Sequence, residues 1–176
     1  MKIRKPKFWD LPKLNLFSYM LIPFSIPIII RNYLFQILKK EKLFLIKTIC
    51  VGNIYLGGTG KTPLTIRIYE ILKKLNYKVA TVKKNYSNQN DEQLLLSQKT
   101  FLIAEKSRKN AISQGLKQNL DFLVFDDGLQ ESGIEFNIKL ACFKTKNWIG
   151  NGQLIPAGPM REKISSLKRF DAVFLN

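Results

Sequence analysis

Histidine is absent from the 176-residue chain, and cysteine occurs only twice. The lack of histidine removes the commonest general base and metal ligand, so acid–base chemistry within this chain has to come from carboxylates. Cys50 and Cys142 lie inside apolar runs, and their spacing fits neither a metal site nor a disulfide framework. We therefore expect two buried free thiols. No segment repeats at a fixed period, which argues against a solenoid.

Acidic residues are scarce, with 13 Asp and Glu against 29 Lys and Arg, and the formal net charge is +16. Such a surplus favours polyanionic partners, although a lysine-rich composition without functional meaning stays open. Residues 1–47 contain ten basic and two acidic residues, so half of the excess lies beside the most apolar stretch. A basic nucleic-acid binder is a further reading, but no recognition motif accompanies the charge, and we expect no nucleic acid as partner.

The sequence also lacks a charge-free run long enough to cross a membrane. Residues 14–30 carry no charge, but these 17 residues are fewer than the roughly 20 that cross a bilayer, and Pro23 and Pro27 interrupt them. No small-residue cleavage site follows, which disfavours a secretory signal. We expect residues 1–45 to form a membrane-associating segment, whose apolar side chains enter the headgroup region while the lysines of residues 39–42 contact an anionic membrane surface. A helix packed on the protein's own core is the alternative.

Strand-like and helix-like segments alternate from residue 46 to residue 176, and we expect this range to form one domain. The predicted strands are residues 46–51, 79–82, 100–104, 122–125, 138–143 and 172–175. The predicted helices are residues 64–75, 91–97 and 107–116, the last with Ser107 as its cap. This alternation predicts an α/β fold with a mostly parallel sheet flanked by helices.

A glycine-rich loop lies between the first predicted strand and the first predicted helix of this domain. Its glycines let backbone N–H groups turn toward phosphate oxygens, and the helix that follows presents its positive end. Lys61 is expected to reach the β- and γ-phosphates of ATP as a catalytic residue, and the Thr62 hydroxyl to bind Mg²⁺. Tyr55 stands where the usual pattern has its first glycine, so an unrelated glycine turn is the alternative. The predicted nucleotide-binding residues are Tyr55, Leu56, Gly57, Gly58, Thr59, Gly60, Lys61 and Thr62.

Adjacent carboxylates, Asp126 and Asp127, follow the apolar strand at residues 122–125. P-loop proteins place an acid in this way beside the metal-bound phosphates. A strand that ends in Asp-Gly is often only a turn, but in combination with the glycine loop the pattern predicts a magnesium site.

Two further stretches contain candidate site residues. Residues 151–162 are rich in glycine and proline and are predicted to form an ordered loop, in which Arg161 faces phosphate charge and Glu162 joins the metal site; a purely structural turn is the alternative. Asp91 and Glu92 are predicted to begin a helix, where carboxylates are also favoured simply because they stabilise helix N-termini.

The motifs in this order resemble those of the tetraacyldisaccharide 4'-kinases, which act in the lipid A pathway. The resemblance runs from about Trp9 to Asn176, through the segments 51–53, 57–63, 91–92, 126–130 and 150–162. It implies a P-loop kinase at the cytoplasmic face of the inner membrane of a Gram-negative bacterium. Such an enzyme transfers the γ-phosphate of ATP to the 4'-hydroxyl of a tetraacylated disaccharide 1-phosphate, giving lipid IVA.

The resemblance also implies roles for matching residues. Asp91 would be the base near the acceptor hydroxyl, with Glu92 beside it. Asp126 and Asp127 would be the carboxylates around Mg²⁺, and Glu162 would contribute to the metal site. Positioning and electrostatics carry most of phosphoryl transfer, which suits such a set.

Three departures from the family pattern stand out. Glu131 replaces the histidine that usually follows Asp-Asp-Gly-Leu-Gln, and residues 83–87 read Lys-Lys-Asn-Tyr-Ser where the family has Ser-Arg-Gly-Tyr-Gly. The family's C-terminal half, with a histidine thought to pair with the base, has no counterpart, so a shortened protein is expected. The alternative to a kinase is therefore a membrane-associated ATP-binding protein or switch derived from this family.

Overall fold

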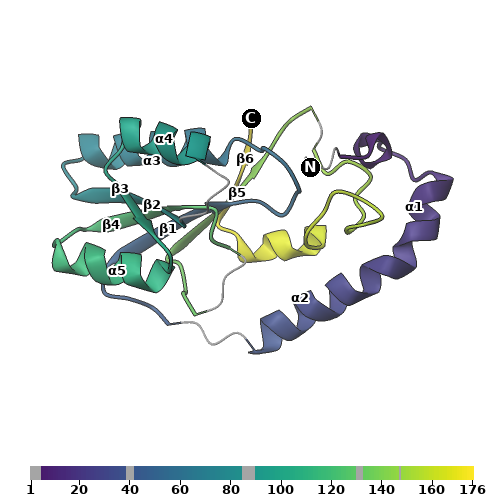
Figure 1. Ribbon diagram of the computed structural model, residues 1–176, viewed down its shortest axis with the longest axis horizontal. Helices are drawn as coiled ribbons and strands as arrows, with labels where there is room; N and C mark the ends of the chain where they lie inside the picture. The colour runs from purple at the N-terminus through teal and green to yellow at the C-terminus, as the bar shows by residue number, and fades with distance from the viewer. Residues whose placement is uncertain (1–4, 39–41, 85–89, 130–132, 147) are drawn as a thin grey trace. The chain divides into compact units, whose positions relative to one another are not determined.

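The computed structural model describes residues 5–38, 42–84, 90–129, 133–146 and 148–176, and in most of them helices and strands alternate (Figure 1). The α-helices are α1 (Leu16–Leu21), α2 (Ile26–Leu38), α3 (Lys61–Lys74), α4 (Asn90–Lys99) and α5 (Arg108–Lys117). The strands are β1 (Lys47–Gly52), β2 (Val79–Lys84), β3 (Leu102–Glu105), β4 (Phe122–Asp126), β5 (Ile138–Phe143) and β6 (Ala172–Leu175). Three short 3₁₀ helices are η1 (Lys7–Asp10), η2 (Ile22–Ser25) and η3 (Ile164–Arg169).

The six strands form one sheet in the order β3-β2-β4-β1-β5-β6. Strand β4 pairs in parallel with β1 and with β2, and β2 pairs in parallel with β3. Parallel neighbours need crossover connections, which here are helical, and strands covered on both faces are mostly apolar. The predicted α/β fold with a mostly parallel sheet is confirmed.

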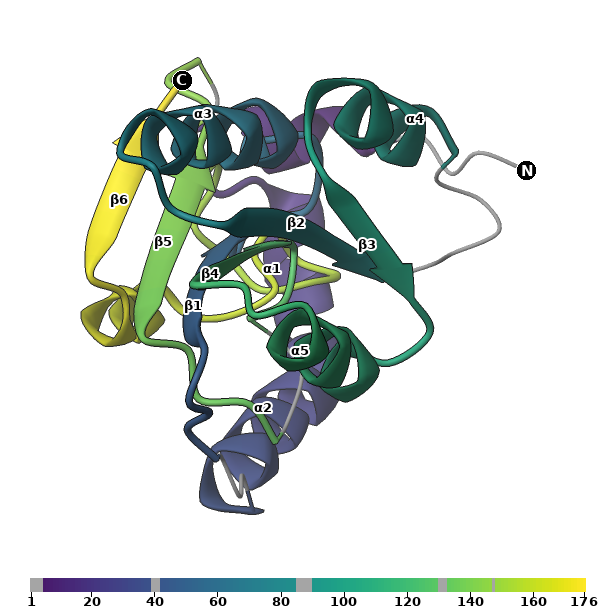
Figure 2. The same cartoon turned by 90° about the vertical axis from the view of Figure 1, so that its left-hand side faces the viewer.

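The chain divides into two compact units. The second unit comprises Lys40–Gly52 and Gly60–Leu140. In it, helices α3 and α4 lie on one face of strands β1 to β4, and α5 lies on the other (Figures 1 and 2). Its core is lined by apolar side chains of the strands, of α5 and of the segment after β4; the buried members are Ile46, Cys50, Ala80, Val82, Ile103, Ala111, Ile112, Leu123, Phe125, Ile134 and Phe136.

The first unit comprises Met1–Lys39, Asn53–Thr59 and Ala141–Asn176. Its core is smaller and consists of Ile54, Tyr55, Ala141, Phe143, Leu154 and Met160. The backbone N–H of Asn176 donates to Phe143 O, so β6 is tied to the end of β5 within this unit. The predicted boundary between residues 45 and 46 stays a prediction.

Helix α3 begins three residues before the predicted start at residue 64. Gly60 adopts a left-handed conformation (φ 84°) at the N-cap, and Pro63 lies in the first turn, where a missing N–H breaks no helical hydrogen bond. Ser107 occupies the N-cap of α5 as predicted, but its side chain makes no capping hydrogen bond.

The apolar N-terminal run is helical over a greater length than its charge-free part. Elements α1, η2 and α2 follow one another without a break, and the helical stretch Leu16–Leu38, 23 residues long, is apolar and long enough to cross a membrane by length and composition. Pro23 and Pro27 do not end this stretch, because each lies in the first turn of its element. Both cysteines are free and buried, as predicted.

The aromatic pair Phe125 and Phe136 allows the core of the second unit to be tested by substitution. Phe125 is fully buried and its ring lies 5.1 Å from that of Phe136. Phe125→Ala should lower the free energy of unfolding by about 3–5 kcal/mol, because it removes buried apolar area and leaves a cavity. Urea denaturation measures the loss. Phe101→Ala, at a half-exposed position of the same unit, is the matched control and should cost less than about 1 kcal/mol; equal losses would contradict the assigned core.

Candidate active site

The loop after β1 is held in shape by its own side chains. Gly57 and Gly60 have φ angles of 135° and 84°, which favour glycine at both positions. The buried Asn53 amide donates to Gly57 O at 3.3 Å and to Thr59 Oγ1 at 3.0 Å. These bonds fix the bend before α3, and the N-terminal amides of α3 follow directly, as in an anion-binding turn.

Tyr55 anchors the start of this loop within the first unit. Its backbone forms an antiparallel bridge with Met160, and its hydroxyl donates to Asp10 Oδ1 at 2.7 Å. The N–H of Leu56 donates to Pro159 O at 2.8 Å. Because that amide is already used, the backbone groups left to face phosphate in this conformation begin at Gly57. Tyr55, in place of the usual first glycine, therefore attaches the loop to the segment at Pro159–Met160.

Strand pairing places Asp126 at the start of α3. The register of β1 and β4 sets Val51 opposite Asp126, at the point where the chain leaves the sheet toward the glycine loop. The Thr62 hydroxyl donates to Asp126 Oδ2 at 2.9 Å, and both residues are buried. The hydroxyl and the carboxylate that were predicted to bind magnesium are thus brought into direct contact.

The donor atoms here fit a magnesium ion. Asp126 Oδ1 is buried and has no hydrogen-bond partner, a costly state for a carboxylate oxygen that a metal ion or its water would relieve. Mg²⁺ prefers oxygen ligands and is usually bound by one or two carboxylates, waters and substrate phosphates. Among the residues that the structure describes, no group of three His, Cys, Asp or Glu side chains could hold a metal ion.

Lys61 and Asp127 form the less deeply buried part of the same cluster. Lys61 Nζ lies 3.6 Å from Asp127 Oδ2. Asp127 has a left-handed backbone (φ 64°), and its N–H donates to Val51 O at 2.9 Å while the buried Arg108 guanidinium donates to its carbonyl oxygen. The turn after β4 is therefore fixed by backbone contacts, and the Asp127 carboxylate is free of the sheet and directed to Lys61.

Comparison with known proteins gives a result that agrees with this geometry, in which a hydroxyl and a carboxylate are in contact at a P-loop-like turn. The family model for tetraacyldisaccharide-1-P 4'-kinase (LpxK) matches residues 17–176. The chain belongs to this family.

Curated relatives named tetraacyldisaccharide 4'-kinase extend beyond the chain. The protein of Pelagibacter ubique is 49% identical over 178 residues, covering 100% of this chain and 56% of the relative. That of Rickettsia canadensis is 32% identical over 192 residues, covering 99% and 58%. The chain thus spans a little more than half the length of these kinases.

The fold is shared with a solved member of the LpxK family. A crystal structure of LpxK from Aquifex aeolicus in complex with ATP has a TM-score of 0.76 and 23% sequence identity, and the match covers 92% of this chain and 59% of that one. At this identity the likeness establishes the common architecture.

The two candidate residues of the acceptor side begin α4. Asp91 and Glu92 lie in its first turn, and both are exposed. Glu92 accepts a hydrogen bond from the Lys83 ammonium, which also donates to Asp126 Oδ2 at 2.8 Å. Lys83 thus connects Asp126, the candidate metal ligand, with the residue next to the candidate base.

Lys83 is the main residue that sequence reasoning missed. The β2–β4 register sets Val82 opposite Phe125, so Lys83 comes level with Asp126. Burial alone would lower the pKa of Lys83, but the charges of Asp126 and Glu92 and the hydrogen bonds to them outweigh burial and raise it above the ordinary value. A lysine in the last two residues of a buried parallel strand, where the kinase family pattern has serine, was the available signal.

Glu162, predicted as a metal ligand, lies in the first unit and forms an ion pair with Arg169. The neighbouring Arg161 is held by its backbone: its N–H donates to Ile54 O at 2.7 Å and its carbonyl accepts from Asn32 at 2.8 Å. The ordered loop predicted for residues 151–162 is present. The metal role of Glu162 stays a prediction.

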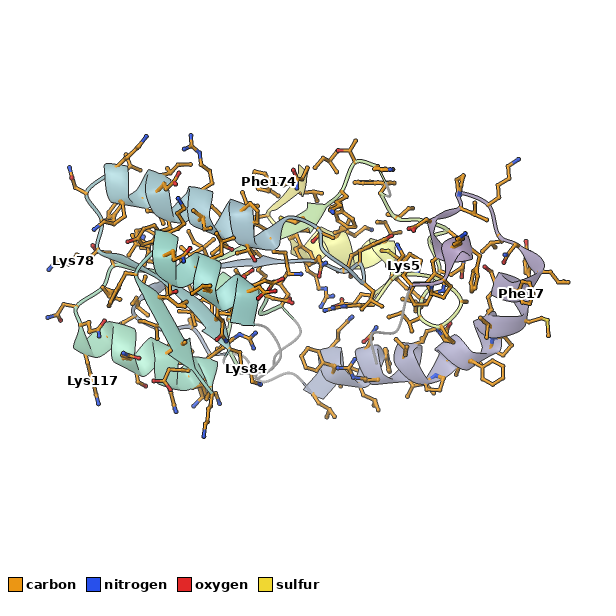
Figure 3. The ribbon with its side chains drawn as sticks, turned by 45° about the horizontal axis from the view of Figure 1, so that its top comes forward. Lys5, Phe17, Lys78, Lys84, Lys117 and Phe174 are labelled. Atoms are coloured by element: carbon orange, nitrogen blue, oxygen red, sulfur yellow. The ribbon has the colours of Figure 1, made fainter. Side chains whose placement is uncertain are left out.

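Helices α1 and α2 are bound to the rest of the first unit by a polar face. Ser18 accepts from the Asn151 amide at 3.1 Å, Ser25 donates to Leu154 O at 3.1 Å, and Asn32 bonds to the carbonyl of Arg161. The three residues are spaced by seven and so lie along one side of the helical stretch. The other sides carry mostly apolar, exposed side chains, as Figure 3 shows for Phe17.

A pocket of about 390 Å³ lies beside this polar face, within the first unit. Its lining combines α2 with the segment after Leu154: Ile29, Asn32, Tyr33, Gln36, Leu154, Glu162, Lys163, Ser165, Ser166 and Arg169. Residues Asn85, Ser87 and Glu131, at which the chain departs from the kinase motifs, lie outside the described residues.

The loop geometry predicts the effect of removing one hydroxyl. Thr59→Val keeps the shape of the side chain but removes the acceptor of the Asn53 amide, so the loop loses a hydrogen bond and retains an unsatisfied buried donor. ATP affinity should fall about tenfold, measured by isothermal titration calorimetry. Thr59→Ser keeps the hydroxyl and should bind ATP as the unaltered chain does; equal losses in both variants would count against the Asn53–Thr59 bond.

Proposed function

We propose that this chain carries the ATP-binding and catalytic site of a tetraacyldisaccharide 4'-kinase, which transfers the γ-phosphate of ATP to the 4'-hydroxyl of a tetraacylated disaccharide 1-phosphate to give lipid IVA. The observation that carries the proposal is the contact between Thr62 Oγ1 and Asp126 Oδ2 at the end of the glycine loop. Family membership and the names of the relatives support the same reaction.

In this proposal the loop binds the triphosphate. Backbone N–H groups from Gly57 to Thr62 surround the phosphate oxygens, and Lys61 exchanges its contact with Asp127 for the β- and γ-phosphates. Thr62 and Asp126 would hold Mg²⁺, with Asp127 near by, and such an ion supplies positive charge that stabilises the charge developing on the transferred group.

On the acceptor side, Asp91 orients the sugar hydroxyl and takes up its proton, and Glu92 is held beside it by Lys83. A carboxylate is the available type of base, because the chain contains no histidine. Phosphoryl transfer depends chiefly on positioning and charge, so one exposed carboxylate at a fixed helix start suits this role.

The amphiphilic acceptor explains the exposed apolar helices. In the proposal, α1 and α2 lie in the cytoplasmic surface of the inner membrane of a Gram-negative bacterium, with their polar face turned to the protein and their apolar sides in the lipid. The three hydrogen-bonded residues along one face favour an interfacial helix, because a spanning helix would leave these contacts. Basic residues next to it attract anionic headgroups.

The direct test is transfer of labelled phosphate. The purified chain is incubated with γ-labelled ATP, Mg²⁺ and vesicles that contain the tetraacyldisaccharide 1-phosphate, and the lipid is analysed for a 4'-phosphate. Labelled lipid supports the kinase. Tight ATP binding without labelled lipid supports an ATP-binding protein or switch derived from the family, and absence of ATP binding refutes both.

Lys61→Ala should weaken ATP binding about 10- to 100-fold, because a charged hydrogen-bond donor to the phosphates is lost. Calorimetry with Mg²⁺ and ATP measures the change. Lys74→Ala, in the last turn of the same helix, is the control and should leave ATP affinity unchanged. Flotation of Lys61→Ala with vesicles should equal that of the unaltered chain. Equal ATP affinity in Lys61→Ala would remove the phosphate-loop assignment.

Phe24→Glu or Ile30→Glu should reduce binding to anionic vesicles by at least about tenfold, because each replaces an exposed apolar side chain of the helical stretch by a charge. Sedimentation or flotation with vesicles measures the partition. Leu75→Glu changes an equally exposed residue of the second unit and should leave binding unchanged. If all three variants bind alike, helices α1 and α2 do not carry the attachment.

A further inference from the structure

Lys83 is a buried cation with two acidic partners. Its side chain is 3% exposed, whereas that of its partner Glu92 is 55% exposed and that of Asp126 is fully buried. An ammonium group is rarely buried to this degree unless paired charges compensate for its lost hydration. The buried residues of β2 that precede Lys83 are uncharged, so Lys83 brings a charge to a position where a hydrophobic residue would need no such compensation.

The Lys83 ammonium binds one oxygen of the Asp126 carboxylate and leaves the other without a partner. Asp126 Oδ2 accepts hydrogen bonds from both Lys83 and Thr62, while Oδ1 has no partner. The carboxylate is therefore held in one orientation by two donors, and one oxygen is left for a further ligand. Lys83 and a metal ion would share the same carboxylate from opposite oxygens.

The charges of the cluster are nearly balanced without a metal ion. Three carboxylates (Glu92, Asp126 and Asp127) are paired with two ammonium groups (Lys61 and Lys83) in the second unit. A divalent cation placed beside Asp126 meets the repulsion of the Lys83 charge within a few ångströms, where screening by water is weak. A nucleoside triphosphate adds several negative charges, so that the cluster becomes strongly negative and attracts a divalent cation.

We propose that Lys83 is a built-in counter-ion of the metal site, which keeps the affinity of Asp126 for free divalent cations low and makes metal binding depend on the nucleotide. It acts through Asp126 and Glu92 and is thus a positioning residue of the site. The part that concerns free metal ions stands on the contacts of Lys83 alone. The part that concerns ATP rests on the proposed function.

The first measurement is the affinity for Mn²⁺ without nucleotide. Electron paramagnetic resonance gives the concentration of free Mn²⁺ during a titration with MnCl₂. Lys83→Gln removes the charge but keeps a hydrogen-bond donor, and it should bind Mn²⁺ at least about tenfold more tightly than the unaltered chain. Lys83→Arg keeps the charge and should bind as weakly as the unaltered chain. A gain of affinity separates the proposal from simple damage to the fold, because a disturbed site would bind Mn²⁺ more weakly.

The matched control is Lys78→Gln. Lys78 precedes strand β2 and is exposed, and Figure 3 shows it and Lys84 at opposite ends of that strand. This variant has the same change of net charge as Lys83→Gln, so it corrects for long-range effects and should leave Mn²⁺ affinity unchanged. Unchanged or weaker Mn²⁺ binding in a folded Lys83→Gln would overturn the proposal, as would equal gains in both variants.

The second measurement compares ATP binding with and without Mg²⁺ by calorimetry. The ratio of the two affinities should rise at least about tenfold in Lys83→Gln, because the site then depends more on the metal for positive charge. An unchanged ratio overturns the nucleotide part of the proposal, whereas no ATP binding by the unaltered chain refutes the proposed function instead.

If Lys83→Gln does not fold, Glu92→Gln keeps the proposal open to test. Glu92 is exposed, and its neutralisation leaves the Lys83 charge to Asp126 alone, so free Mn²⁺ should bind several-fold more weakly. Equal or tighter Mn²⁺ binding by this variant would overturn the proposal.

Discussion

The hydrogen bond between the Thr62 hydroxyl and the Asp126 carboxylate depends on the alignment of two parallel strands. β1 and β4 are paired so that Val51 and Asp126 are level, and the chain leaves β1 there for the glycine loop and returns as α3. A shift of one residue in this pairing would turn Asp126 to the other face of the sheet. The buried apolar side chains that fix the register therefore also fix the distance between the two oxygen atoms on which the proposed chemistry rests.

Charge in this site is arranged as alternating pairs rather than as a single patch. Lys61 is paired with Asp127, and Lys83 lies between Asp126 and Glu92, so each acidic group of the cluster has a basic neighbour. The chain as a whole is strongly basic, yet its candidate active site is close to neutral. The surplus of lysine is thus a property of the surface and of the N-terminal region, and it says little about the local potential at the site.

The fold and the glycine turn before α3 were predictable because they follow local rules: apolar runs of strand length, glycines before Lys-Thr, and carboxylates after a buried strand. Lys83 and Asn53 escaped prediction because their roles arise from contacts across the sheet and within a folded loop, which no spacing in the chain encodes. Ser18, Ser25 and Asn32 were missed for another reason. Single polar residues in an apolar run carry no motif, and only the structure shows that these three form hydrogen bonds to Asn151, Leu154 and Arg161.

Because Ser18, Ser25 and Asn32 are seven residues apart, the N-terminal helices should tolerate substitutions but not insertions or deletions. Their outward side chains can be exchanged among apolar types with little effect on the protein, since none packs in a core. Loss or gain of a single residue between Ser18 and Asn32 would rotate one end by about 100° relative to the other and turn a hydroxyl or amide toward the lipid. Evolution of this segment should therefore replace residues but should not insert or delete them between Ser18 and Asn32.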